Sequence, residues 1–143
     1  MNRYLALKNK HEKEVNAFPM FFAFSDKQFE DGMAKFGLKP DETDKIYKFG
    51  NTGGFYRRTD SKKLKEMLIR HTAEMQQAIE EDLTGDEFIY DMFNYELSNH
   101  EYCITWDLAP TLDCLGLTLE EVNADKRLLH GLKRAMRKNR YER

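Results

Sequence analysis

One stretch near the middle of the sequence decides the fold, namely FIYDMFNYEL at residues 88–97. At helical spacing its apolar side chains leave almost no polar face, and a helix that is apolar nearly all round is normally the buried centre of a domain. Thr84, Gly85 and Asp86 interrupt the helical pattern just before it. The sequence therefore predicts a helix over 86–97, or slightly beyond, as the most buried element of the protein.

Further helices are expected on both sides of this segment. The longest runs from Asp60 or Ser61 to about Leu83, because apolar residues recur there at intervals of three and four. Ser25 and Thr118 precede two others as caps, each with Gln or Glu three positions later. The other helices are expected over 2–17, from Asp107 to Gly116, and from about Asp125 onward.

Three short segments are expected to be strands. Residues 20–24 form a continuous apolar run, whereas 45–49 and 55–58 flank a glycine-rich loop, which is typical of a β-hairpin. Together they predict a three-stranded sheet. Residues 103–106 are also β-prone and are expected to form either a fourth strand or an extended connector.

We therefore predict an α+β fold in which a small antiparallel sheet of about three strands packs against five or six helices. The 143 residues are expected to form a single domain, whose basic C-terminal end (139–143) frays. No apolar run approaches the ~20 residues that span a bilayer, and charges interrupt any candidate signal peptide, so no membrane partner is expected. Two cysteines, Cys103 and Cys114, are too few for a disulfide scaffold, which favours a reducing cytoplasm.

Charge is unevenly distributed along the chain, although the formal net charge is only −2. Residues 71–125 hold 14 Asp and Glu and no Lys or Arg, whereas residues 126–143 hold 8 Lys and Arg and one acid. Such asymmetry bears on partners and association rates rather than on the fold. Either the basic ends fold back over the acidic middle and neutralise it, or an acidic face stays exposed.

An exposed acidic face would engage a basic protein partner without any catalysis. Carboxylates spaced along a helix can resemble a row of phosphates, so such a face could occupy a partner's site that is meant for nucleic acid. Six residues are expected to contribute to this partner-binding surface: Glu74, Glu80, Glu81, Asp82, Asp86 and Glu87.

The basic C-terminal helix supports a second hypothesis, in which the protein binds nucleic acid. Its clustered cations would give a salt-sensitive contact with phosphates. Two features oppose this hypothesis, the acidic middle of the chain and an isoelectric point of 6.1. Both indicate negative charge, which would repel a phosphate backbone. The residues expected to carry the contact are Arg134, Arg137, Lys138 and Arg140.

A third hypothesis is a small enzyme centred on His100, Glu96 and Asp91. It rests on a polar cluster near the end of the central helix: Asp91, Asn94, Glu96, Asn99, His100 and Glu101. Glu96 and His100 are spaced as ligands of a divalent metal, but no second His–carboxylate pair lies near them in the sequence. An acidic neighbourhood disfavours Cys103 as a nucleophile, and Cys114 is interpreted as a core residue. We therefore expect no metal, no cofactor and no catalytic residue.

The segments FPMFFAFS (18–25), GGF (53–55) and FIYDMFNYEL (88–97) resemble a group of small uncharacterised proteins from phages and mobile elements of gut bacteria. The resemblance covers residues 15–135 and carries no activity. It implies a small soluble accessory protein of a mobile element, and inhibition of a host defence nuclease is one role that fits such a setting.

Overall fold

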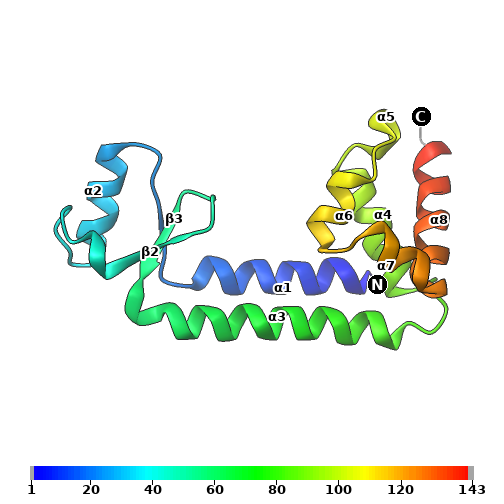
Figure 1. Cartoon of the computed structure of the whole chain (residues 1–143), viewed down its shortest axis with the longest axis horizontal. Coiled ribbons are helices and arrows are strands. Elements are labelled where there is room, and N and C mark those ends of the chain that lie inside the picture. Colours follow the sequence, from blue (N-terminus) through cyan, green and yellow to red (C-terminus); the bar gives the residue numbers. More distant parts are fainter. Residues whose placement is uncertain (1, 142–143) are drawn as a thin grey trace. The chain divides into compact units, whose positions relative to one another are not determined.

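The computed structural model describes residues 2–141 and contains two compact units (Figure 1). The helical unit comprises the described residues up to Lys10 and those from Ala73 onward, and the sheet unit comprises His11–Thr72. Helices α1 (Arg3–Ala17) and α3 (Ser61–Glu81) contribute residues to both units. The fold class is α+β, as predicted, whereas the single folding domain stays a prediction.

The sheet unit is built on a β-hairpin to which one short strand is added. Strand β3 lies between β1 and β2 and is antiparallel to both, with Tyr47 opposite Tyr56 and Phe21 opposite Phe55. In chain order its elements are β1 (Phe21–Phe22), α2 (Asp26–Lys35), η1 (Thr43–Lys45), β2 (Ile46–Phe49), β3 (Gly54–Arg57) and η2 (Arg58–Asp60). All three predicted strands are therefore confirmed, although β1 is shorter than the 20–24 segment.

Helix α2 covers one face of this sheet. The Ser25 hydroxyl accepts the N–H of Gln28 as predicted, but the Gln28 side chain accepts the N–H of Phe24 rather than that of Ser25. A side chain at Gly32 would collide with the Phe21 ring, with a Cβ only 2.1 Å from it, so glycine permits this close approach. Phe21 forms a small core with Met33 and Ile46, to which α1 and α3 add no buried residue.

The helical unit is centred on α4 (Phe88–Asn99), and the prediction of a buried central helix is confirmed. Six of its residues are buried, and it packs most extensively against α8 (Lys126–Tyr141) (Figure 1). Tyr4 from α1 closes the core from another side, with its ring 5.7 Å from that of Phe88. The remaining helices of this unit are α5 (Tyr102–Thr105), α6 (Ala109–Leu115) and α7 (Leu119–Ala124).

The prediction of a strand or extended connector at 103–106 is wrong. These residues lie in and just after α5, a single helical turn with left-handed backbone at both ends, φ 57° at Glu101 and φ 58° at Trp106. Burial of Tyr102 holds this turn in place. With it, the described residues form eight α-helices rather than five or six, and the sheet's core includes only α2 among them.

Helix α8 continues through part of the segment that is expected to fray. Helix α8 continues to Tyr141, and Asn139 is buried, where its side chain donates to the Ala135 carbonyl at 2.8 Å. Residues 139–141 are therefore helical, and residues 142–143 lie outside the described part of the chain.

Asp82 organises the junction between α3 and α4. Its carboxylate is 1% exposed and accepts four backbone N–H groups, those of Thr84, Gly85, Glu87 and Ile89, at 2.8–3.1 Å. Burial opposes ionisation, but these donors outweigh burial and lower the pKa of Asp82 below its ordinary value. The orphan amides at the start of α4 are thereby satisfied by a side chain from the preceding helix end.

Arg127 links α8 to the same junction. Its guanidinium donates to the carbonyls of Ile79 at 3.0 Å and Asp82 at 2.9 Å, at the end of α3. Asp125, just before α8, accepts from the guanidinium at 3.0 Å and holds it in this orientation. The side chains of Asp82 and Arg127 thus join α3, α4 and α8 through hydrogen bonds to backbone groups.

Gly131→Ala is expected to lower the free energy of unfolding by up to about 2 kcal/mol, the net of an overpacking cost of up to about 3 kcal/mol and a helix-propensity gain of about 1 kcal/mol. The new Cβ would lie 2.6 Å from the Ile89 side chain and 2.7 Å from the Gly85 carbonyl oxygen, where α4 and α8 meet. This overpacking should exceed the about 1 kcal/mol that alanine gains over glycine in a helix. Urea unfolding followed by circular dichroism measures the change, with exposed Lys133→Ala as control. A variant as stable as the parent would contradict the close approach of the two helices.

Asp82→Asn should destabilise the protein by about 1–3 kcal/mol at neutral pH, because a neutral amide replaces a charged acceptor. The pKa of Asp82 is lower in the folded state than in the unfolded state. The contribution of Asp82 to the free energy of unfolding is therefore complete above the unfolded-state pKa, and it is lost as the pH falls through the folded-state pKa. The difference between parent and variant in urea unfolding should therefore shrink on acidification below about pH 4. Exposed Asp113→Asn is the control, and a pH-independent difference would refute the capping role.

Candidate functional site

The predicted acidic surface is partly used within the protein. Asp82 does not belong to it, because this carboxylate is buried and caps α4, which corrects the sequence-based assignment. Glu74 lies 3.0 Å from Lys10 Nζ, and Glu81 lies 3.0 Å from an Arg3 guanidinium nitrogen. Cations from the N-terminal helix therefore compensate two of the six residues.

The C-terminal helix compensates a third. Asp86 contacts His130 Nε2 at 2.7 Å and Arg134 at 3.1 Å, and these contacts, His130 first, lower the pKa of Asp86. Glu80 and Glu87 are exposed, and no ion pair to either occurs among the described residues. The side chains that remain for an acidic partner-binding surface are thus fewer than expected.

Glu96 is the centre of a buried polar group in the helical unit. Its side chain is 0% exposed, and it lies among the six buried residues of α4. Both contacts to its Oε2 come from α1: the Tyr4 hydroxyl donates to it, and Lys8 Nζ lies 3.0 Å away. A buried carboxylate is tolerated only when it is paired and hydrogen-bonded in this way.

The other oxygen of Glu96 faces a different pair of side chains. Oε1 lies 3.9 Å from His100 Nε2, and the Cys114 sulfur from α6 is within 4.8 Å of both ligand atoms. Both Oε1 and Nε2 are buried, and within the part of the chain that is described neither has a hydrogen-bond partner of normal geometry. We call Glu96, His100 and Cys114 the three-residue cluster.

The electrostatics of this region follow from Glu96. Burial, and then the Glu96 carboxylate, raise the pKa of the Tyr4 hydroxyl far above its ordinary value. Burial alone would lower the pKa of Lys8, but its contact with Glu96 outweighs burial and raises it. Burial first and Glu96 second also raise the pKa of the Cys114 thiol. Lys8 therefore stays charged at neutral pH.

Only Glu96 and His100 of the six predicted cluster residues come together. Asn94 accepts instead from the Asn139 amide at 3.1 Å, and burial raises the pKa of Asp91 elsewhere on α4. Asn99 and Glu101 are exposed.

Sequence reasoning missed Tyr4, Lys8 and Cys114 in this region. Cys114 is exposed rather than part of the core, which corrects the interpretation made from its leucine neighbours. One signal was available, because an acid inside a helix that is apolar all round must itself be buried. Nothing in the sequence indicates which distant residues would satisfy it.

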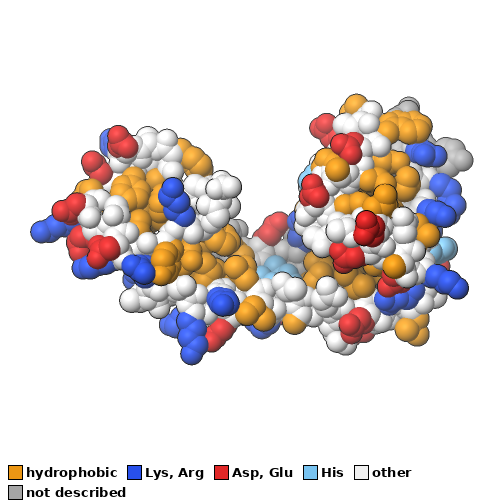
Figure 2. All heavy atoms as spheres, in the orientation of Figure 1, with side chains coloured by type: hydrophobic (Ala, Val, Ile, Leu, Met, Phe, Trp, Pro, Cys, Tyr) orange, Lys and Arg blue, Asp and Glu red, His pale blue; other side chains and the backbone are white. Residues whose placement is uncertain are grey.

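Helix α8 presents a cationic face to solvent. Helix α8 contains no acidic residue, and six of its cations are exposed: Lys126, Lys133, Arg134, Arg137, Lys138 and Arg140. Figure 2 shows Lys and Arg side chains gathered where α8 runs in Figure 1. All four residues of the nucleic-acid hypothesis belong to this face.

Aromatic rings support two of these arginines. The Arg134 guanidinium lies 4.2 Å from the centre of the Tyr90 ring, and the Arg140 guanidinium lies 4.8 Å from that of Trp106. Trp106 is 50% exposed, so its ring lies at the surface beside the cationic face. Such cation–π contacts hold the charged groups at defined positions.

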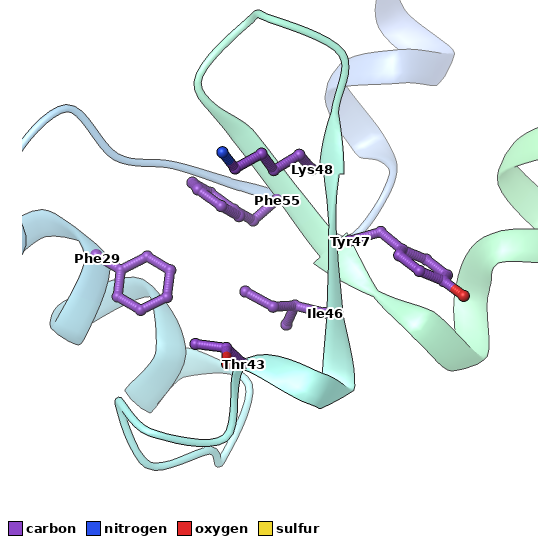
Figure 3. Close-up of a pocket in the computed structure, with 6 residues that line it drawn as sticks. All are labelled: Phe29, Thr43, Ile46, Tyr47, Lys48 and Phe55. Carbon is purple, nitrogen blue, oxygen red and sulfur yellow. The ribbon is translucent and has the colours of Figure 1, made fainter.

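The sheet unit contains an apolar groove of about 430 Å³ beside β2 (Figure 3). The side chains of Phe29, Ile46 and Phe55 point toward one another there, whereas Tyr47 points away on the opposite side of the strand. Among the residues that line it, Lys48 is the only titratable group apart from Tyr47. The groove thus holds no group of side chains suited to catalysis.

No described helix combines the length and apolar composition that crossing a membrane requires. A family model described as "Family of unknown function (DUF7659)" matches residues 3–138. No curated protein matches the chain. No solved structure matches it either. Because the family model spans nearly the whole sequence, the chain belongs to the DUF7659 family of unknown function.

Proposed function

We propose that this protein binds nucleic acid through the cationic face of α8. The observation that carries the proposal is the set of six exposed cations on one helix that has no acid of its own. Contacts between such cations and phosphates release counterions and supply most of the sequence-independent affinity for nucleic acid. This was one of the alternatives drawn from the sequence, and the geometry supports it better than the others.

The spacing of the cations along α8 fits an extended polyanion. Lys126, Lys133, Arg137 and Arg140 follow one another at intervals of seven, four and three residues, so they share one side of the helix. At 1.5 Å per residue this row extends over about 21 Å. The opposite side is fixed in the core, because Leu132 and Ala135 are buried against the other helices. The row is therefore presented outward by a packed helix.

The exposed ring of Trp106 favours single-stranded nucleic acid as the ligand. An exposed aromatic ring next to an arginine can stack on an unpaired base, and such stacking is worth about 1–3 kcal/mol per base. Trp106 is half exposed and has Arg140 over its ring. A base stacked on this ring would place its phosphates next to the cationic face.

The acidic residues of the chain do not neutralise the positive charge of this face. The buried Asp82 and Glu96 are enclosed in the protein, and Glu74 and Glu81 are paired with cations of α1. The alternative of an acidic surface for a basic protein partner retains Glu80 and Glu87 as exposed carboxylates without ion pairs among the described residues. We propose it second, because fewer residues support it.

The setting forms part of the proposal. We infer a cytoplasmic accessory protein of a phage or mobile element, on the basis of the resemblance of three segments to such proteins. Cys103 and Cys114 are not joined in a disulfide, which agrees with a reducing compartment. A nucleic-acid-binding accessory protein is consistent with that setting.

The double variant Lys133→Gln and Arg137→Gln should weaken binding to a fluorescein-labelled single-stranded oligonucleotide. Each lost phosphate contact reduces the dependence of log K on log salt by about 1, so the slope should fall by about 2. Fluorescence anisotropy at several salt concentrations measures both affinity and slope, and quenching of Trp106, the one tryptophan of the chain, reports stacking directly.

The matched control removes two exposed lysines from another helix, Lys63→Gln and Lys65→Gln on α3. It makes the same change in net charge and should leave the affinity and the salt slope nearly unchanged. Absence of binding by the parent protein at low salt would refute the proposal. So would an equal loss of affinity in the control, because binding would then follow net charge rather than α8.

A further inference from the structure

We propose that Glu96, His100 and Cys114 form a binding site for a divalent transition metal, with Zn²⁺ as the preferred ion. The three side chains offer one oxygen, one nitrogen and one sulfur atom, all within 4.8 Å of one another. This site is separate from the cationic face of α8 and does not depend on the proposed binding of nucleic acid.

The first support is the unsatisfied state of two buried atoms. Glu96 Oε1 and His100 Nε2 are buried and, among the described residues, accept or donate no hydrogen bond of normal geometry. Leaving a buried polar atom unpaired costs about 1–3 kcal/mol, and more for a charged group, so native proteins seldom leave two together. The two atoms lie 3.9 Å apart, with the Cys114 sulfur within 4.8 Å of each, so one bound cation would satisfy both.

The second support is the way the carboxylate is held. Tyr4 and Lys8 both contact Oε2, so Glu96 is oriented with Oε1 directed at His100 and Cys114. Partners on the second oxygen of a metal-binding carboxylate are a usual feature of metal sites, because they fix the ligand before the ion arrives.

The distances are close to those of a tetrahedral site. With metal–ligand bonds of about 2.0–2.3 Å, neighbouring ligand atoms are separated by about 3.3–3.6 Å. Glu96 Oε1 and His100 Nε2 are 3.9 Å apart and the Cys114 sulfur lies within 4.8 Å of both, so metal binding would draw the His100 and Cys114 side chains inward by up to about 1 Å. His100 is partly exposed and Cys114 is exposed, which leaves both free to adjust and leaves a route for the ion.

The mixed set of donors indicates the class of metal. Thiolate and imidazole favour Zn²⁺ and related borderline-soft ions, whereas Mg²⁺ and Ca²⁺ are bound by oxygen atoms. Binding would displace the thiol proton of Cys114 to solvent, so the thiolate and the Glu96 carboxylate would bring two negative charges to the ion. Three protein ligands leave a fourth position, which a water molecule would fill.

Cobalt provides the test, because Co²⁺ occupies zinc sites and a thiolate ligand gives it a charge-transfer band in the near ultraviolet. The full-length protein, freed of metal with a chelator, should bind one Co²⁺ per chain with this band and with the strong visible absorption of a tetrahedral ion. Added Zn²⁺ should bleach both signals. Cys114→Ser should abolish the charge-transfer band, and His100→Gln should weaken binding by more than about tenfold.

Matched controls keep the test independent of folding. Cys103→Ser and His130→Gln change the same residue types outside the cluster and should bind Co²⁺ like the parent protein. Cys114 is exposed, so its replacement should leave the helical circular dichroism unchanged. Absence of a Co²⁺ spectrum in the parent, or a charge-transfer band that survives Cys114→Ser or disappears with Cys103→Ser, would overturn the proposal. None of these results would change the expected binding of nucleic acid.

Discussion

The helical unit depends on how two buried carboxylates, Asp82 and Glu96, are satisfied. Removing an ionised group from water is costly unless donors replace the water, and here each group receives them from a different part of the chain. Asp82 takes four backbone amides around the start of α4, while Arg127 caps the end of α3 beside it. Glu96 takes Tyr4 and Lys8 from α1. These contacts determine where α1, α3 and α8 can lie around the central helix.

This arrangement also explains how a chain with a strongly acidic middle can present a basic surface. Part of the acidic charge is enclosed in the protein or paired with cations of α1, and Asp86 binds His130 and Arg134. The outward row of α8 contains no acid, and the other side of the helix is held in the core by Leu132 and Ala135. The cations that stay exposed on α8 are the basis of the proposed binding of nucleic acid.

Much of the fold was predictable because local signals decide it. The caps at Ser25 and Thr118, the glycine stop at Gly116 and the apolar α4 all gave elements that the structure contains. The helical turn at 102–105 was missed because four β-prone residues carry little periodicity. The burial of Asp82 had a local signal, because the turn residues Thr84 and Gly85 follow it. The partners of Glu96 are about 90 residues away in the sequence and depend on tertiary packing alone.

The most direct test of the account is a map of the nucleic-acid contact by NMR. Amide chemical shifts of the labelled full-length protein would be followed while a short oligothymidine is added at low salt. The account predicts that shift changes concentrate along residues 126–140 and at the Trp106 indole, and that they diminish as salt is raised. Changes confined to the hairpin of β2 and β3, or none at low salt, would contradict it.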